Sequence, residues 1–259
     1  MKQQIASVLA AGALAVASVP ALAQSVSNGS FETFSGAFGG DGGAALNAGS
    51  GLLTGWTIAS ANGNNLALLN NTNAYFNKTP FGSNNIDLTG YFDFLPGAFL
   101  SQNITGFIPG QTYRLSFWLG LQSGSCGNAG NNTCDGPNGA NVKVGSLPTQ
   151  QFTHSVGVAV SGGQSLETLN NLGGLVATTI WDPFSYEFIA NSESMLLSFS
   201  TNAAAQGTNL YSGLDNVSLE RVGGSAVVPL PAAGWLLLSG VGLLGWLPSR
   251  TAGRSCSPP

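Results

Sequence analysis

The sequence predicts an all-β sandwich between Gln24 and Val222, a stretch of about 200 residues that suits a single domain. Apolar residues alternate with polar ones over short segments, as in strands with one buried face. Glycine, proline and asparagine separate these segments and mark turns. No sustained apolar pattern at helical spacing occurs in this stretch. Short alternating strands joined by such turns are typical of β-sandwiches.

The predicted strands follow one another at short intervals along the chain. In order, they fall at 53–58, 66–69, 85–88, 100–104, 113–119, 142–144, 156–160, 184–188, 195–199 and 214–219. Residues 35–51 and 120–141 are predicted loops rich in glycine. Residues 164–172 are the one stretch that could form a helical turn. The only histidine, His154, is expected at the surface or at a strand end.

The clearest alternation lies at 113–119. One face of this strand carries Tyr113, Leu115, Phe117 and Leu119. Successive side chains of a strand point to opposite faces of the sheet. Trp118 therefore faces away from the core, together with Arg114 and Ser116.

The N-terminus has the pattern of a secretory signal peptide. Lys2 precedes an apolar region from Ile5 to Val19, and Ala21-Leu22-Ala23 is a small-x-small cleavage site. We expect residues 1–23 to be removed and the mature chain to begin at Gln24.

The C-terminus combines a proline motif, a charge-free apolar run and a basic end. The motif is Val228-Pro229-Leu230-Pro231-Ala232, the apolar run continues to Leu247, and Arg250 and Arg254 follow. The two prolines fix φ and favour an extended segment of the kind a protease binds. A helix over about 232–247 is about 24 Å long, which is short for a hydrocarbon core of about 30 Å.

This order of parts resembles the PEP-CTERM sorting tail of Gram-negative bacteria, in its VPLPA variant. The resemblance implies cleavage near the proline motif by an exosortase-type membrane protease. The precursor would be anchored transiently in the inner membrane, and the product would reach the cell surface or the extracellular space. An ordinary C-terminal anchor that is never cut is the alternative. The predicted organisation is a signal peptide (1–23), a β-sandwich (24–222), a linker (223–227) and a sorting tail (228–254).

The exported stretch is acidic and sparsely charged. It holds eleven acidic and four basic residues, a formal charge of −7. Nucleic-acid binding rests on Lys and Arg that neutralise phosphates, so the charge argues against a nucleic-acid partner and against anionic lipid. A surface built from Asn, Gly, Ser and Thr suits neutral polysaccharide.

Two cysteines in the exported stretch lie close together in the sequence. Cys126 and Cys134 bracket a flexible loop, and in an oxidising compartment a disulfide is expected. A metal or redox pair is the alternative, although the spacing is not C-x-x-C.

Several short motifs follow one another along the exported stretch. They include Asn28-Gly-Ser-Phe-Glu32, Gly55-Trp56, Pro109-Gly110-x-x-Tyr113-x-Leu-x-Phe117 and Leu214-Asp215-Asn216-Val217. Their order resembles that in the galactose-binding-domain-like jelly rolls of carbohydrate-binding modules and bacterial surface proteins. The resemblance implies a structural calcium held by Glu32 and Asp215. Calcium takes six to eight oxygen ligands, and Asn28, Asn47 and carbonyls of residues 35–51 are candidates to complete the shell. A solvated Glu and a turn Asp are the alternative.

Aromatic residues outside the core are the candidates for sugar contact, because a flat ring stacks on the apolar face of a pyranose. Tyr91-Phe92-Asp93 combines two rings with a carboxylate, and Trp118 faces outward. Rings that merely cover the sandwich are the alternative.

Enzymatic signals are weak. No Gly-x-Ser-x-Gly elbow, phosphate loop or zinc spacing occurs. The sequence therefore predicts a non-catalytic matrix protein that acts with exopolysaccharide in a biofilm or floc. A carbohydrate-binding module with a defined sugar site is the alternative, followed by a glycan hydrolase with an unmarked carboxylate pair.

Overall fold

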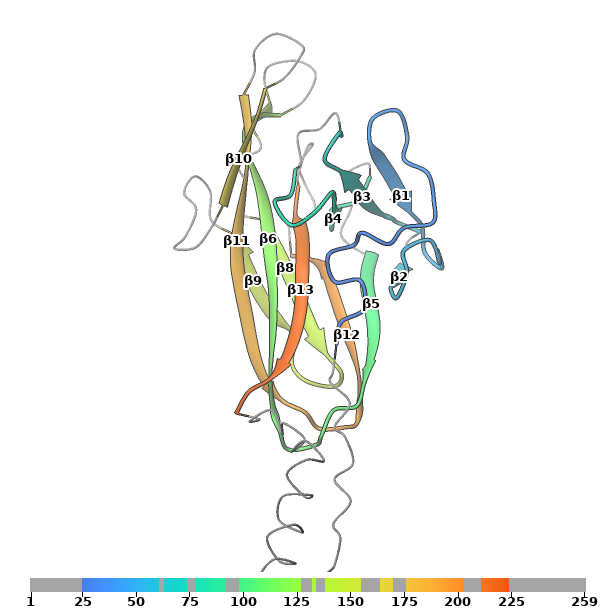
Figure 1. Cartoon of the computed structure of the whole chain (residues 1–259), viewed down its shortest axis with the longest axis vertical. Coiled ribbons are helices and arrows are strands. Elements are labelled where there is room, and N and C mark those ends of the chain that lie inside the picture. The colour runs from blue at the N-terminus through green and yellow to red at the C-terminus, as the bar shows by residue number, and fades with distance from the viewer. Residues whose placement is uncertain are drawn as a thin grey trace, which may run out of the picture. The chain divides into compact units, whose positions relative to one another are not determined.

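The protein forms two antiparallel β-sheets (Figure 1). The computed structural model describes residues 25–60, 63–73, 78–91, 98–126, 132–133, 138–154, 164–169, 176–202 and 211–223. The chain divides into two compact units, and the first ends at Val222. Among the described residues, no helix is long and apolar enough to cross a membrane. The predicted signal peptide and the predicted tail, residues 228–254, lie outside the described residues.

The first sheet has eight strands. They are β1 (Gly43–Leu46), β3 (Leu66–Asn70), β4 (Asn84–Asp87), β13 (Gly213–Arg221), β6 (Thr112–Cys126), β11 (Val176–Ile189), β10 (Gln164–Leu169) and β7 (Asn132–Thr133). Their order is β1-β3-β4-β13-β6-β11-β10, and β7 pairs with β6. The closing strand β13 therefore lies in the middle of the sheet, beside the long strand β6.

The second sheet has five strands. They are β2 (Thr57–Ser60), β5 (Ala98–Thr105), β12 (Ser194–Thr201), β8 (Asn138–Val144) and β9 (Gln150–His154), in that order across the sheet. The predicted all-β class is confirmed.

The core fills the space between the inward faces of the two sheets. The predicted alternation in β6 is confirmed, because Tyr113, Leu115, Phe117 and Leu119 are all buried. The Phe117 ring meets the ring of Phe199 in β12 with centroids 5.4 Å apart and that of Phe152 in β9 at 5.1 Å. Burial of such a ring contributes about 1.5–3 kcal/mol, so contacts between the sheets hold the sandwich together.

Three predictions of local structure are wrong. The predicted loop at 120–141 begins and ends within strands, because β6 continues to Cys126 and β8 starts at Asn138. Residues 35–51, predicted as a loop with few core residues, contain β1, whose Leu46 is fully buried. Small residues such as Ala44 carry little periodic signal, and pairing with β3 decides the conformation. Residues 164–169, in the stretch 164–172 that could form a helical turn, instead form β10 because they pair with the first part of β11.

Other predictions fall on parts of the chain that the structure describes incompletely. The expected strand at 156–160 lies outside the described residues. Cys126 ends β6 and pairs through its backbone with Asn132, whereas Cys134 lies outside the described residues. The disulfide therefore stays a prediction.

Candidate functional site

Three adjacent strands present an ordered set of side chains on the outer face of the first sheet. In register, β11, β6 and β13 form rows across the strands: Glu187, Arg114 and Glu220; then Ser185, Ser116 and Ser218. The next row holds Pro183, Trp118 and Asp215, and the one after it holds Trp181, Gly120 and Gly213. A row of small hydroxyl side chains thus lies between an ionic row and an aromatic row.

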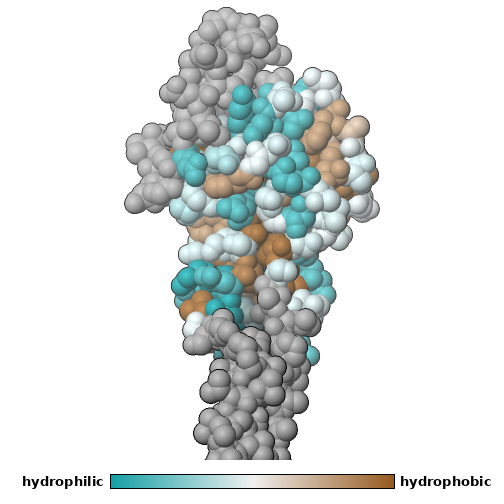
Figure 2. Space-filling view, in the orientation of Figure 1, coloured by the Kyte–Doolittle hydropathy of each residue, from teal (hydrophilic) through white to brown (hydrophobic). Residues whose placement is uncertain are grey.

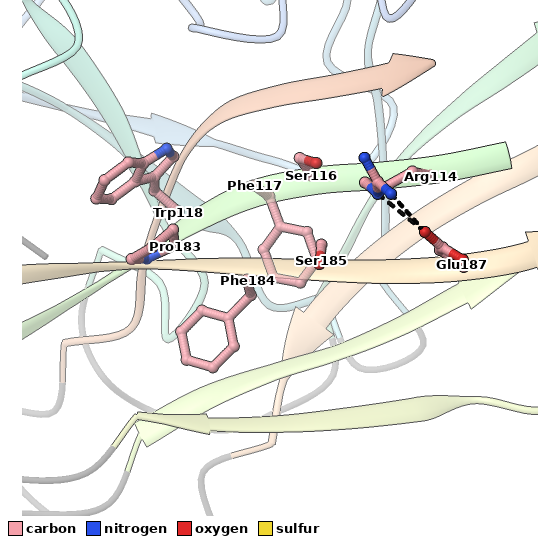
Figure 3. A pocket seen from close by; sticks show the side chains of 8 residues that line it. All are labelled: Arg114, Ser116, Phe117, Trp118, Pro183, Phe184, Ser185 and Glu187. Carbon is pink, nitrogen blue, oxygen red and sulfur yellow. Dashed lines mark hydrogen bonds and ion pairs between the residues drawn. The ribbon is translucent and has the colours of Figure 1, made fainter. Parts of the chain in front are cut away.

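A hollow of about 520 Å³ lies on this face (Figure 3). Its outward-pointing lining residues are Arg114, Ser116, Trp118, Pro183, Ser185 and Glu187, and we call it the Trp118 hollow. Rows two residues apart on a strand are about 6.8 Å apart, so the ionic wall at Arg114 and the aromatic wall at Trp118 stand about 14 Å from each other. Figure 2 shows that hydrophilic residues cover much of the described part of the visible face, with apolar residues among them.

The ionic wall centres on one guanidinium. Arg114 donates from Nη2 to Glu187 Oε1 at 2.7 Å and from Nη1 to Glu220 Oε1 at 2.8 Å. The hydrogen bond and charge of Glu187, and then those of Glu220, raise the pKa of Arg114 above its usual value. All three side chains are substantially exposed, and exposed pairs add little to stability. The wall instead offers fixed hydrogen-bonding groups with a net charge of −1 to whatever enters the hollow.

The aromatic wall is backed by a second cluster of apolar residues outside the sandwich core. Ala67, Leu69, Trp181 and Tyr211 are buried in it, and Phe81, Tyr91 and Trp118 pack against it half-buried. The Phe81 and Trp118 rings have centroids 4.5 Å apart. Trp118 is thereby held in place while one side of it lines the hollow.

Trp181 fits against the sheet only because its neighbours lack side chains. A Cβ at Gly120 would lie 2.8 Å from the Trp181 ring, and one at Gly213 would lie 2.9 Å from it. The indole Nε1 donates to the carbonyl of Lys78 at 2.6 Å. Trp181 therefore fastens residues 78–84 to the outer face of the sheet.

The other predicted sugar-contact residues are not brought to the Trp118 hollow. Tyr91 donates from its hydroxyl to Asp41, and its ring lies against Gly43 at the start of β1. Strands β3, β4 and β13 separate β1 from β6 in the sheet. Phe92 and Asp93 lie outside the described residues.

Glu32 and Asp215 are brought into one electrostatic environment. Glu32 Oε1 accepts from the amides of Ser83 and Asn84 at 2.8 and 2.9 Å. Asp215 is fully buried and accepts from the Thr79 hydroxyl and, at 2.6 Å, from the amide of Asn216. Burial raises the pKa of Asp215 to about 8, and the charge of Glu32 adds to this rise. A bound cation would favour the charged form of Asp215.

The backbone beside both carboxylates is strained. Phe31 and Asn216 have φ of 60° and 49°, respectively, a region that residues other than glycine rarely adopt. Strain of this kind persists only where the surrounding structure enforces it. The positions of Glu32 and Asp215 are therefore tightly determined.

The donor set fits an ion that binds oxygen. Two carboxylates and the Thr79 hydroxyl are ligands of the type that calcium takes. Within the described residues, no group of three or more His, Cys, Asp or Glu side chains could hold a metal, so carbonyl groups would have to complete a shell. Asn28 is not available for it, because its side chain bonds the backbone of Thr33 and Thr54. Asn47 is exposed.

The sequence did not identify Thr79, Phe81 or the serine row. Thr79 and Phe81 lie in a stretch without periodicity. The serines are placed in one row only by the register of β11, β6 and β13.

His154 ends β9 but is buried rather than at the surface. Its Nε2 lies 3.1 Å from Asp182 Oδ2 of β11, and both side chains are at most 2% exposed. The pair links the second sheet to the first. Because both side chains are buried, neither His154 nor Asp182 is exposed to a substrate in this structure.

No protein-family model and no curated protein matches the chain. Among solved structures, a chain described as "CBM4 structure and function" is 14% identical, with a TM-score of 0.30, over 76% of this chain and 99% of that one. The K1 adhesin domain of Lys-gingipain from Porphyromonas gingivalis W83 is 13% identical, with a TM-score of 0.39, over 70% and 99%. An exo-β-1,3-galactanase from Phanerochaete chrysosporium is 14% identical, with a TM-score of 0.29, over 68% of this chain and 27% of that one. These likenesses are too low to indicate a function.

Proposed function

We propose that the protein binds a polysaccharide in the Trp118 hollow and does not transform it. This function is supported by the arrangement of side chains around the Trp118 hollow. A half-buried indole faces a row of hydroxyls, beyond which a fixed guanidinium and two carboxylates stand. Binding sites of this composition combine an apolar platform with a few oriented polar groups, and a pyranose presents both an apolar face and hydroxyls.

The hollow suits a continuous chain because, at its level in the sheet, β11 and β13 have no described neighbour on the sides that face away from β6. In the described residues, no strand pairs with β11 beyond Trp181 on the side away from β6. Likewise, no described strand pairs with β13 beyond Leu214 on its far side. The serine row spans three strands and is about 10 Å long. A linear polymer can therefore lie across the strands and leave the hollow at both ends.

The test is a binding measurement with the producing cell's own exopolysaccharide. Trp118→Ala should reduce retention of the full chain on the immobilised polymer by about tenfold, if a sugar ring stacks on the indole about as strongly as a nucleic-acid base does, at about 1–3 kcal/mol. Phe99→Ala is the matched control, because Phe99 is 42% exposed on β5 of the other sheet. Unchanged retention of the Trp118 variant would exclude the hollow as the site.

We also propose the sequence-based expectations that place this site outside the cell. The protein is a galactose-binding-domain-like jelly roll, exported with a signal peptide and sorted through its 228–254 tail by an exosortase-type protease. It acts in an extracellular matrix with exopolysaccharide. Calcium held by Glu32, Asp215 and Thr79 would neutralise the acid pair and stabilise this part of the sandwich.

A further inference from the structure

The loop at residues 78–84 connects two features that the sequence alone keeps apart. Near its start it contacts Asp215 through Thr79, and at its end it contacts Glu32 through the amides of Ser83 and Asn84. Between these contacts it carries Phe81, which packs on Trp118. We propose that this loop positions the Trp118 ring, and that Thr79 couples the ring to the Glu32–Asp215 pair. Phe81 and Thr79 are thus positioning residues, and neither lines the hollow.

The first step of the coupling passes through one hydroxyl. Thr79 Oγ1 donates to Asp215 Oδ2 and accepts from the amide of Phe81 at 3.1 Å. The position of the Phe81 backbone is therefore tied directly to a buried carboxylate. Loss of this hydroxyl removes both hydrogen bonds at once.

Hydrogen bonds hold the parts of the loop on either side of Phe81. A displacement of Thr79 therefore moves Phe81 more than its neighbours. Asn71 accepts from the Thr79 amide at 2.9 Å and donates to the carbonyls of Thr79 and Gly82 at 3.0 and 2.9 Å. Glu32 holds the amides of Ser83 and Asn84. Both ends are thus bonded to the body of the sandwich, and Phe81 is the side chain between them that reaches Trp118.

The second step passes through ring contacts. Phe81 lies 4.5 Å from Trp118 at an interplanar angle of 47°, and 6.2 Å from Trp181 at 89°. Trp181 is fixed by its bond to Lys78 and by the glycines beneath it. Trp118 has more freedom, because it is half-buried at the edge of the cluster. A shift of Phe81 therefore moves the Trp118 ring and changes the position of the aromatic wall.

The first experiment monitors the environment of the Trp118 ring by ¹⁹F NMR and needs no ligand. The full chain has five tryptophans, so a preparation labelled with 5-fluorotryptophan gives a small set of ¹⁹F resonances, and Trp118→Phe assigns the one of interest. Thr79→Val keeps the shape of the side chain but removes the hydroxyl, whereas Thr79→Ser restores it. We expect Thr79→Val and Phe81→Leu to shift or broaden the Trp118 resonance, and Thr79→Ser and Phe99→Leu to leave it in place. The resonance of Trp56, which lies in the sandwich core, reports whether each variant is folded.

The second readout is affinity for exopolysaccharide, and it rests on the proposed function. Loss of an aromatic contact should weaken binding by about 2- to 10-fold in Thr79→Val and Phe81→Leu. An unmoved Trp118 resonance in both folded variants would overturn the inference. Retained binding by Trp118→Ala together with a moved resonance would overturn the proposed site but support the positioning role. A variant that binds weakly while its Trp118 resonance is unchanged would count against the coupling.

Discussion

Raising the pH from about 4 to about 8 without divalent cations should destabilise the folded domain through Asp215. This carboxyl is fully buried, and burial raises its pKa from 3.8 to about 8, despite hydrogen bonds from Thr79 and Asn216 that act in the opposite direction. Between these two values the folded chain keeps a proton that the unfolded chain has lost. The folded state therefore binds more protons, and the free energy of unfolding falls as the pH rises through this window. Above about pH 8 the effect levels off.

The size of the change in the free energy of unfolding follows from the pKa shift of Asp215. One pKa unit corresponds to 1.36 kcal/mol, so a rise of about four units amounts to about 5 kcal/mol across the window. In a domain of this length, a change of 1 kcal/mol moves the melting temperature by about 2–4 °C. The contribution of Asp215 should therefore be about 10–20 °C between pH 4 and pH 8.

The assay is thermal unfolding of the full chain in chelator at several pH values, with Asp215→Asn alongside. The amide does not titrate, so the difference between the two proteins isolates Asp215 from all other groups. Glu193→Gln, a change at an exposed carboxylate, should follow the wild-type curve. Calcium added at pH 8 should restore stability in the wild-type chain and not in Asp215→Asn, because a ligand that binds only the folded state stabilises it.

Parallel pH curves for the wild-type chain and Asp215→Asn would refute this reasoning. They would show that the carboxyl is solvated and ionised in the folded state. A calcium effect of equal size in both proteins would place any bound ion elsewhere.

Two further predictions concern the tail and the pair between the sheets. Truncation after residue 227 should leave the protein in soluble export fractions, whereas the full chain should appear first in the inner membrane; identical fractionation would rule out sorting by the tail. His154→Ala should lower the free energy of unfolding by about 3–5 kcal/mol, because it removes the imidazole beside the buried carboxylate of Asp182. Urea denaturation measures this loss. Replacing both residues by leucine should recover most of it, and a loss below about 1 kcal/mol in the single variant would contradict the pairing.

Sequence periodicity predicted the parts of the fold in which large side chains mark the faces. The alternation from Tyr113 to Leu119 placed both the core side of β6 and the outward position of Trp118. It could not find β1, where alanine and glycine give no contrast between faces. Nor could it assign β10, whose conformation is set by its partner β11. Long strands such as β11 begin earlier than their aromatic residues indicate.

The candidate site was only partly accessible to the same reasoning. An outward tryptophan on an alternating strand is a local signal, so Trp118 could be named. The serine row depends on the relative register of three strands that are distant in sequence. The roles of Thr79 and Phe81 depend on a loop whose hydrogen bonds reach residues 8 to 136 positions away. Such contacts leave no pattern in a single sequence.

The closing strand β13 has a consequence for how the protein would carry force. It holds Asp215 near its start and Ser218 and Glu220 beside the hollow, and it ends at Arg221, next to the segment that leads into the C-terminal tail. A polymer lying along the serine row would contact β13 at Ser218, three residues before Arg221 and so close along the chain to the point where an anchored tail leaves the domain. Tension between cell and matrix would then pass through the hydrogen bonds of β13 and β6, while the rest of the sandwich would remain unloaded.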